Sequence, residues 1–470
     1  MTGVTADTLV GADAVFGVSG FRSRVAESFT PSVVLRLALA FAAQIKARGG
    51  RSVVVGRDTR PCGAMAFYAA ASGLTASGLD VIDVRIAPTP TILHAAACYG
   101  ADGCMTLTAS HNPAEWNGIE FAAERGKLLA ENEREALWRG FREGAASLAS
   151  WDAQGEVTAR SDASDLHIQK ILDLGDVDAE AVRRRAPRVV IDACNGAGSV
   201  VSPALLRRLG CDVVELFCTP DGRFPRSTEP TATGVEALRE TVIRVKADVG
   251  FAHDVDADRT VMVDECGAFV PEEYTFALVA DAILRNDRRP MVTTVVTGGL
   301  LDEVASAHAV DILRTPVGVG HVVDRMRDVD AAVGGESTGG VVIPGTHLTA
   351  DGIAAMAVIV TALARDERAL SEWVGRYGRY HMVKAKAPML GGRPVEEVFE
   401  TLAGLYPEAS VNRMDGLKLE FDDAWLVVRP SGTEPVLRVF AESRDRARAE
   451  DLVTRALVRV NEAVDDKPRL

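Results

Sequence analysis

The sequence predicts an α/β protein with three related α/β domains on mixed, mostly parallel sheets, followed by a smaller C-terminal α+β domain. Two observations lead to this prediction. A pattern of apolar strand, helix and second strand recurs three times at wide spacing, and alternating strands follow near the C-terminus. A chain of 470 residues also exceeds what one hydrophobic core usually supports, so several domains are expected.

Each copy of the pattern is read from a short apolar run, an amphipathic or Ala-rich helix, a glycine or turn, and another apolar run. In chain order, the strand, helix and strand are expected at 53–56, 63–77 and 79–86, at 188–192, 200–209 and 211–217, and at 291–296, 300–309 and 310–313. Near-continuous apolar strands joined by helices are typical of parallel sheets buried on both faces. Functional sites in such sheets lie at the strand ends.

The segment from about residue 371 has a different pattern, with strands that alternate between apolar and polar residues. We expect a helix at 395–405, strands at 417–421, 425–429 and 437–442, and a closing helix from 447. The predicted domains are therefore 1–160, 161–265, 266–372 and 373–470.

Composition narrows the class of function. The chain has 52 basic and 66 acidic residues and a formal charge of −14, which disfavours nucleic acid as a partner. No signal-peptide pattern opens it and no apolar run is long enough to cross a bilayer, so we expect a cytoplasmic protein without a membrane partner. The seven cysteines lack CxxC spacing, so we expect reduced thiols and neither disulfides nor a zinc site.

The sequence TASHNP, residues 108–113, places the hydroxyl of Ser110 beside the imidazole of His111 in a polar turn after an apolar run. This arrangement suits a serine that carries a phosphoryl group. A hydrolase triad is the weaker interpretation, because it needs an acid partner and an oxyanion hole that the sequence does not show.

The sequence DVDADR, residues 254–259, presents Asp254, Asp256 and Asp258 on a short segment after an apolar run. A turn there could aim three hard oxygens at one point, and Mg²⁺ takes few carboxylates together with a phosphate oxygen. Arg259 could offset part of their mutual repulsion. A solvated acidic turn explains the spacing equally well.

Two further loops carry polar groups between glycines or prolines. In RPSGTEP, Arg429, Ser431 and Thr433 can donate to a phosphate while Gly432 lets the backbone approach it; a plain turn is the alternative. In GGESTGG, residues 334–340, a carboxylate and two hydroxyls could contact vicinal sugar hydroxyls, although a surface loop explains it as readily.

These loops, in this order and spread over the whole chain, resemble those of the α-D-phosphohexomutase superfamily, which includes phosphoglucomutases, phosphomannomutases and phosphoglucosamine mutases. TASHNP resembles the phosphoserine loop, DVDADR the metal loop and RPSGTEP the phosphate-binding loop. GGESTGG resembles the sugar-recognition loop, in which Glu336 and Thr338 would contact ring hydroxyls. FGVSGFR, residues 16–22, resembles the N-terminal signature that carries an active-site arginine, here Arg22.

The resemblance implies four domains around a deep central cleft, each contributing one loop. It implies reversible phosphoryl transfer between the 1- and 6-hydroxyls of a hexose, through phosphorylated Ser110 and a hexose 1,6-bisphosphate. One Mg²⁺ per chain would be held by Ser110, Asp254, Asp256 and Asp258. His111 is the candidate for proton handling, Arg22 and Arg259 would add donors, and the loop with Arg429, Ser431, Gly432 and Thr433 would grip the distant phosphate.

The chain departs from the family pattern at two positions. Glu120 stands where a lysine proposed as a general acid/base often follows Asn-Gly-Ile, and Ser23 stands where a glycine often follows the signature arginine. Both raise the expectation of an unusual substrate or a reduced rate. Bacterial phosphoglucosamine mutases often have SASHNP in the serine loop. The resemblance with TASHNP therefore favours glucose and mannose phosphates over glucosamine phosphate.

Three alternatives stay open: a phosphoglucosamine mutase, a non-catalytic sugar-phosphate-binding protein and a metal-dependent phosphatase. The expected partner is a hexose phosphate, and the expected state is a monomer or homodimer.

Overall fold

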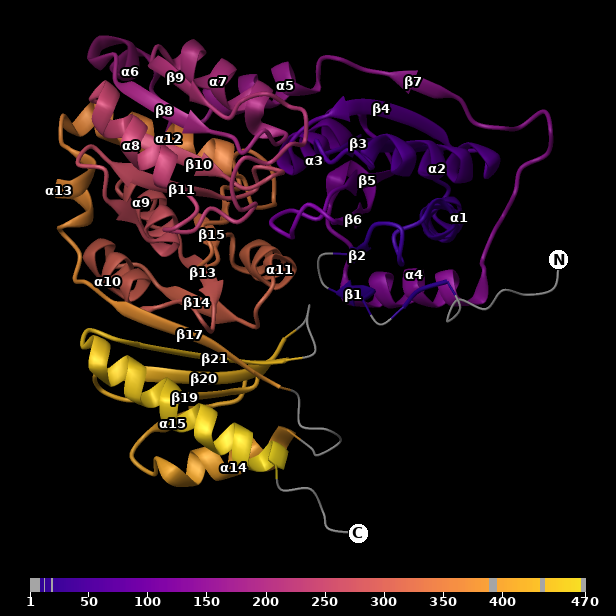
Figure 1. Cartoon of the computed structure of the whole chain (residues 1–470). Helices are drawn as coiled ribbons and strands as arrows, with labels where there is room; N and C mark the ends of the chain where they lie inside the picture. Colours follow the sequence, from indigo (N-terminus) through magenta and orange to yellow (C-terminus); the bar gives the residue numbers. More distant parts are fainter. Residues whose placement is uncertain (1–8, 12, 18–19, 389–394, 432–435, 466–470) are drawn as a thin grey trace, which may run out of the picture.

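The computed structural model describes residues 9–11, 13–17, 20–388, 395–431 and 436–465, with side chains up to 462. Four sheets follow one another along the chain, and the first three are mixed sheets covered by helices. Figure 1 shows the second, third and fourth domains stacked one below another, with the first domain beside the second and third. The predicted α/β class with a smaller C-terminal domain is confirmed.

The first domain is built on a seven-stranded sheet in the order β1-β2-β6-β5-β3-β4-β7. Strands β3, β4, β5 and β7 pair in parallel, and β6, β2 and β1 continue antiparallel. Its elements are β1 Val15–Gly17, β2 Gly20–Arg24, α1 Pro31–Ala47, β3 Ser52–Arg57, α2 Gly63–Ala76, β4 Asp80–Ile86, α3 Thr89–Tyr99, β5 Gly103–Leu107, β6 Trp116–Ala122, the 3₁₀ turn η2 Glu124–Gly126, α4 Glu131–Glu143 and β7 Val157–Ala159.

The second domain carries a five-stranded sheet in the order β12-β11-β10-β8-β9. Strands β8, β9 and β10 are parallel, and β11 and β12 are antiparallel to their neighbours. Its elements are α5 Ala163–Leu172, α6 Ala179–Arg185, β8 Arg188–Asp192, α7 Gly198–Leu209, β9 Asp212–Leu216, α8 Glu236–Val245, β10 Val249–His253, β11 Thr260–Asp264 and β12 Phe269–Val270.

The third domain carries a four-stranded sheet in the order β14-β13-β15-β16. The strand expected at 310–313 begins two residues later, because the Val310 amide bonds to the Ala305 carbonyl and closes the preceding helix. Its elements are α9 Glu272–Leu284, β13 Met291–Thr294, α10 Gly299–His308, β14 Ile312–Thr315, α11 Val319–Val329, β15 Val333–Gly335, β16 Val341–Val342, α12 Gly352–Asp366 and α13 Leu370–Val374.

The fourth domain is an antiparallel sheet in the order β17-β21-β20-β19-β18, packed against two helices. In β20, Leu426 and Val428 pack in the core of this domain, and their neighbours Trp425 and Val427 pack against Val295 and Val296 of the third domain. Its elements are β17 His381–Pro388, α14 Val395–Leu405, β18 Ser410–Asn412, β19 Leu417–Glu420, β20 Ala424–Pro430, β21 Val436–Ser443 and α15 Arg446–Asp465.

One topology repeats in the three α/β sheets. Each has three parallel strands and a fourth antiparallel strand beside them, in the orders β4-β3-β5-β6, β9-β8-β10-β11 and β14-β13-β15-β16. The link into the antiparallel strand spans 108–115, 254–259 and 336–340 in turn. TASHNP, DVDADR and most of GGESTGG therefore occupy the same position in three sheets, at the carboxyl end of a parallel strand.

The second and third domains share one hydrophobic core, which runs from Ile168 to Trp373. Helix α12 is apolar on all sides and its residues are buried almost throughout, as expected of a central helix. Asp351 caps this helix by accepting from the amides of Ile353 and Ala354, and it also bonds to the buried His167 on α5. The metal loop of the second domain and the GGESTGG loop of the third are therefore held on one shared core.

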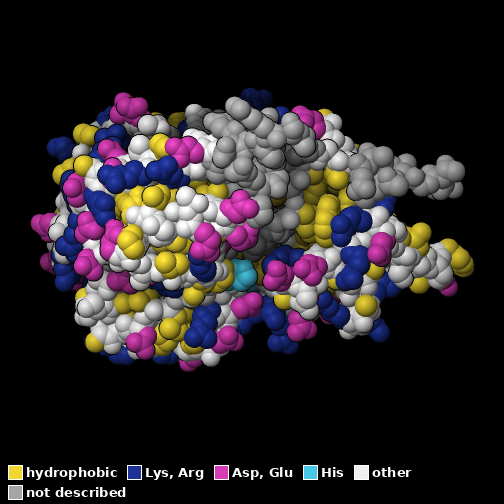
Figure 2. All heavy atoms as spheres, turned by 90° about the horizontal axis from the view of Figure 1, so that it is seen from below, with side chains coloured by type: hydrophobic (Ala, Val, Ile, Leu, Met, Phe, Trp, Pro, Cys, Tyr) yellow, Lys and Arg dark blue, Asp and Glu magenta, His cyan; other side chains and the backbone are white. Residues whose placement is uncertain are grey.

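Among the described helices, none has the length and apolar character to cross a membrane. All seven cysteines are free thiols. On the face seen in Figure 2, acidic and basic side chains are interspersed with apolar and neutral ones.

Candidate active site

The serine loop, residues 108–113, links β5 to β6 and brings Ser110 against the second domain. Ser110 is 1% exposed and has a positive φ of 46°, a left-handed conformation that non-glycine residues rarely adopt. Its Oγ donates to Asp254 Oδ2 at 2.7 Å and lies 3.2 Å from His111 Nδ1. The predicted carrier serine therefore meets the predicted metal loop directly.

His111 lies in a strongly cationic surrounding. Burial, and then the guanidinium groups of Arg259 and Arg22, hold the pKa of His111 well below its ordinary value. The imidazole is therefore neutral near pH 7. The His111 carbonyl accepts from Thr228 Oγ1 at 2.6 Å, which ties the serine loop to the second domain.

The metal loop, residues 254–259, gathers three carboxylates. One oxygen from each of Asp254, Asp256 and Asp258 lies within 4.8 Å of the others. Asp254 and Asp256 are 0% and 1% exposed, which rules out a solvated acidic turn. Burial, followed by repulsion from the neighbouring carboxylates, raises the pKa of each to about 7.

The donor set of this loop fits a divalent cation. Asp256 Oδ1 and Asp258 Oδ1 are buried and lack a hydrogen-bond donor, while Asp256 Oδ2 accepts from Thr89 Oγ1 at 2.7 Å. Buried anionic oxygens without donors are costly unless a cation compensates them. Few carboxylates with an open side towards a phosphate are the set that Mg²⁺ prefers.

Arg22, on β2, connects the serine loop to Glu120 on β6. It donates to the Ala109 carbonyl at 3.3 Å, to Asn112 Oδ1 at 2.9 Å and to Glu120 Oε1 at 3.1 Å, while its Nε has no partner. Burial raises the pKa of Glu120 to about 7, although Arg22 opposes the shift. The position where the family pattern has lysine thus carries a carboxyl group paired with Arg22.

Arg259 is the last residue of the metal loop and meets the sugar loop, residues 334–340, through an antiparallel bridge to Gly340. Its carbonyl bonds to Nδ1 of the buried His253 at 2.9 Å, and burial lowers the pKa of His253 to about 4. A neutral His253 therefore donates from Nδ1 and fixes the backbone at Arg259.

The sugar loop is more enclosed than the surface-loop interpretation requires. Its glycines are buried, and Glu336 Oε1 accepts from the Gly318 amide at 3.1 Å. Thr338 Oγ1 is buried without a partner. Glu336 and Thr338 thus offer an acceptor and a hydroxyl beside Arg259.

The fourth domain contributes Arg429 and Ser431 at the end of β20; Gly432 and Thr433 lie outside the described residues. Arg429 Nε lies 3.0 Å from Asp415 Oδ1, and the other oxygen of Asp415 accepts from the Val317 amide of the third domain. Ser431 Oγ accepts from Arg438 Nε at 3.1 Å. Arg438 stands opposite Arg429 in the β20–β21 pair and adds to the positive charge at His111.

Sequence reasoning missed three residues that shape this site: Arg60, Thr89 and Arg438. Thr89 begins α3 directly after Pro88, and its amide donates to the Asp256 carbonyl at 3.0 Å. Arg60 follows β3 and donates to four carbonyls of the serine loop and its continuation. The charged run Asp58-Thr59-Arg60 at the carboxyl end of a parallel strand was the available signal.

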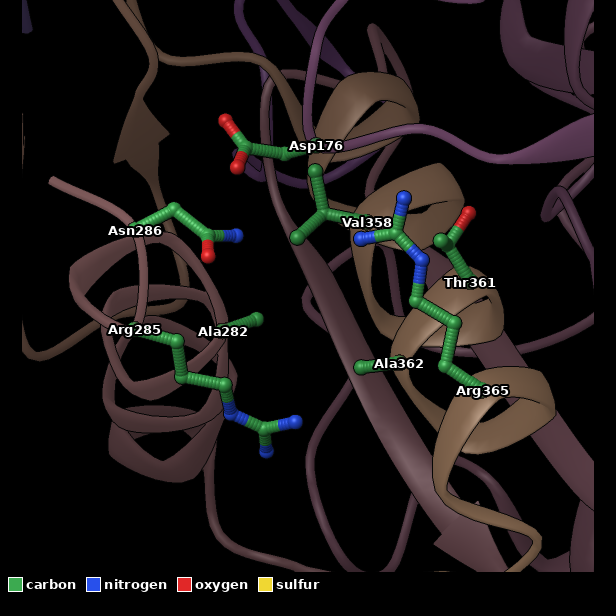
Figure 3. Close-up of a pocket in the computed structure, with 8 residues that line it drawn as sticks. All are labelled: Asp176, Ala282, Arg285, Asn286, Val358, Thr361, Ala362 and Arg365. Carbon is green, nitrogen blue, oxygen red and sulfur yellow. The ribbon is translucent and has the colours of Figure 1, made fainter.

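A separate cavity of about 420 Å³ lies between α9 and α12, lined by none of the loop residues above. Figure 3 shows Arg285 and Arg365 on its opposite walls. Arg285 already pairs with Asp281 and Asp366, and Arg365 with Asp178. The cavity therefore presents no unpaired cation among these residues.

Comparison with known proteins agrees with this arrangement. Four domain profiles of phosphoglucomutase/phosphomannomutase match in order: alpha/beta/alpha domain I at 13–147, domain II at 165–267, domain III at 271–380 and the C-terminal domain at 383–457. The structure of a phosphoglucomutase/phosphomannomutase family protein from Burkholderia thailandensis matches with a TM-score of 0.85 and 26% identity, over 97% of this chain and 99% of that one.

Two similar sequences carry different names. A phosphoglucomutase/phosphomannomutase of Thermococcus kodakarensis is 39% identical, over 96% of this chain and 99% of its own. A probable phosphoglucosamine mutase of Methanopyrus kandleri is 38% identical, over 93% of this chain and 95% of its own. With all four domains matched in order, the chain belongs to the phosphoglucomutase/phosphomannomutase family of phosphohexomutases, which are isomerases.

Proposed function

We propose that this chain interconverts the 1-phosphate and 6-phosphate of a hexose, with glucose and mannose phosphates as substrates and Ser110 as the phosphoryl carrier. The observation that carries the proposal is the buried Ser110 hydroxyl, 2.7 Å from Asp254 in a loop of three carboxylates. A hydroxyl beside a metal-type donor set and several arginines suits phosphoryl transfer better than acyl transfer.

Two transfers complete the reaction. Phosphorylated Ser110 gives its phosphoryl group to the free hydroxyl of the bound hexose phosphate, whose proton leaves, and a hexose 1,6-bisphosphate forms. After the bisphosphate turns end over end, the Ser110 oxygen takes the other phosphoryl group and the product hydroxyl regains a proton. Neutral His111, whose Nδ1 lies 3.2 Å from Ser110 Oγ, is the candidate for proton handling.

The remaining loops bind and orient. Arg22 and Arg259 supply guanidinium donors beside Ser110, Glu336 and Thr338 receive ring hydroxyls, and the loop from Arg429 grips the phosphate distant from Ser110. Asp254, Asp256, Asp258 and phosphorylated Ser110 would hold one Mg²⁺. When bound, the ion neutralises negative charge on the transferred group.

The test is a substrate panel with purified protein, Mg²⁺ and a hexose 1,6-bisphosphate primer. Glucose 1-phosphate, mannose 1-phosphate and glucosamine 6-phosphate are compared by kcat/KM, with Ser110→Ala as the control. We expect the first two to be turned over and the control to be inactive. Absence of isomerisation of every sugar would refute the proposal.

Glucosamine phosphate is the second candidate substrate, supported by the name of the Methanopyrus kandleri relative, which is nearly as similar as the Thermococcus kodakarensis one. A higher kcat/KM for glucosamine 6-phosphate would select it. A non-catalytic sugar-phosphate-binding protein would differ from both, because intact-mass measurement would find no phosphate on Ser110 that a hexose phosphate discharges.

A further inference from the structure

We propose that Arg60 is a positioning residue that sets the backbone of the serine loop and thereby the direction of the Ser110 hydroxyl. The inference rests on the function proposed above, because it concerns how the carrier serine is held during transfer. Arg60 lies on the segment after β3, is 2% exposed, and donates to the serine loop.

All five N–H donors of the Arg60 guanidinium are in use. Nε donates to Asp58 Oδ2 at 3.1 Å, and the four other N–H groups each reach a backbone carbonyl. These carbonyls belong to Pro113 at 2.7 Å, Trp116 at 2.9 Å, Ser110 at 2.7 Å and Asn112 at 2.7 Å. Only a planar fork with five donors can satisfy this set.

The amide of Ser110 is tied to the same ion pair from the other side. Ser110 N donates to Thr108 Oγ1 at 2.9 Å, and Thr108 Oγ1 donates to Asp58 Oδ2 at 2.7 Å. Asp58 is fixed in turn by Arg60, whose own amide donates to Asp58 Oδ1 at 2.9 Å. Both the amide and the carbonyl of Ser110 therefore depend on Arg60 and Asp58.

Every carbonyl of residues 109–113 accepts from a side chain. Arg22 donates to the Ala109 carbonyl and Thr228 to the His111 carbonyl. Arg60 donates to the carbonyls of Ser110, Asn112 and Pro113. A carbonyl turned towards a cation is turned away from a phosphate on Ser110, which it would otherwise repel. The left-handed conformation of Ser110 is maintained by these bonds, since the residue type does not favour it.

Arg60→Lys tests the proposal, because lysine keeps the charge but cannot reach four carbonyls in one plane. The matched control is Arg36→Lys, because Arg36 holds the carbonyls of Phe141 and Arg142 at the end of α4, away from the site. We measure kcat and KM for the best hexose phosphate, and hydrogen exchange of the amides at 108–117 without substrate.

We expect Arg60→Lys to lower kcat by roughly 100-fold with KM changed less than about threefold, because misplacement by about 1 Å costs that much. Amides in the serine loop should exchange faster, and Arg36→Lys should change neither quantity. A folded Arg60→Lys protein with wild-type kcat and wild-type exchange overturns the proposal.

Thr108→Val serves if Arg60→Lys does not fold, because it breaks only the link from Asp58 to the Ser110 amide. Faster exchange at Ser110 supports the proposal, and unchanged exchange overturns it. The exchange measurement needs no turnover, so it separates this inference from the function. A wild-type protein that is inactive on the whole panel refutes the function alone.

Discussion

Two clusters of buried carboxylates in this protein have opposite surroundings. The metal loop gathers Asp254, Asp256 and Asp258 between the first and second domains. Glu273 on α9 and Glu442 on β21 meet at the start of α10, between the third and fourth domains. Burial raises the pKa in both clusters, to about 7 for each aspartate and about 8 for Glu273.

The two clusters differ in the number of carboxylates and in the kind of donor that reaches them. Glu273 accepts from the Gly298 amide, and Glu442 accepts from the Gly299 amide and the Trp425 indole. These amides lie at the start of helix α10, and the partial positive charge at a helix N-terminus favours a carboxylate. Asp256 Oδ1 and Asp258 Oδ1 have no donor, and neither has Glu442 Oε2. Neither burial nor an oxygen without a donor separates the two clusters. The metal loop differs because one oxygen from each of three carboxylates lies within 4.8 Å of the others.

The largest expected effect separates the two clusters by activity. Asp256→Asn should lower Mg²⁺-dependent turnover by roughly 1,000-fold, because it removes one charged oxygen from the cation site. The melting temperature without Mg²⁺ should stay level or rise, since one repelling charge is lost. The measurement pairs steady-state kinetics with thermal unfolding in chelator.

Glu273→Gln is the matched control, because it also neutralises a buried carboxyl group, here at the start of α10 beside Glu442. Its turnover should remain within a few-fold of wild type. Equal losses in both variants would mean that the two clusters do not differ in function.

The second effect concerns stability and Mg²⁺. A cation that binds only the folded chain should stabilise it by about 2.7 kcal/mol when present at about 100 times its Kd. Thermal unfolding with Mg²⁺ and with chelator should show this shift in wild type and in Glu273→Gln. Asp256→Asn should lose most of it, and a full shift in that variant would contradict the assignment of the loop.

The two clusters differ in whether the sequence could predict them: the metal loop was predicted and the glutamate pair was not. Apolar runs such as Val53-Val54-Val55 are sufficient to place strands, and α14 occupies 395–405 as expected. The motif loops were found because several polar groups stand together in the chain. Their shared position in three sheets follows from the repeated topology once the pairing is known.

Contacts between distant residues left no comparable signal. Thr89 and Asp256 are 167 residues apart in the chain, and Val317 and Asp415 are 98 apart. The run Asp58-Thr59-Arg60 marks a strand end, but the four carbonyls that Arg60 binds lie about 50 residues away, and only the tertiary fold brings them close. Glu273 and Glu442 resemble ordinary surface glutamates until α10 is placed between them.

The third effect is a pH dependence of stability at the glutamate pair. The pKa of Glu273 is raised from 4.5 to about 8, first by burial and then by Glu442, despite Lys384 and Arg314. A raised pKa means that the folded state holds the proton more tightly. Stability from this group is therefore complete below its unfolded pKa and is lost as pH rises through the folded value.

Wild type should accordingly lose more stability than Glu273→Gln between about pH 5 and pH 8. Thermal unfolding across this range, with saturating Mg²⁺ to keep the metal loop constant, measures the difference. Parallel curves for the two proteins would show that Glu273 does not carry the proton.

The smallest effect tests whether the neutral hydroxyl that donates to Asp256 acts as a substitute for the cation. Thr89→Val removes the hydroxyl that donates to Asp256 Oδ2 and should cost about 1 kcal/mol in chelator. Bound Mg²⁺ stabilises the same carboxylate, so the penalty should shrink when the ion is present. Thr91→Val is the control. Thr91 lies on α3, like Thr89, but its hydroxyl bonds to His167 on α5, so its penalty should not depend on Mg²⁺. If the two variants respond alike to Mg²⁺, the hydroxyl of Thr89 supports the helix and not the cation site.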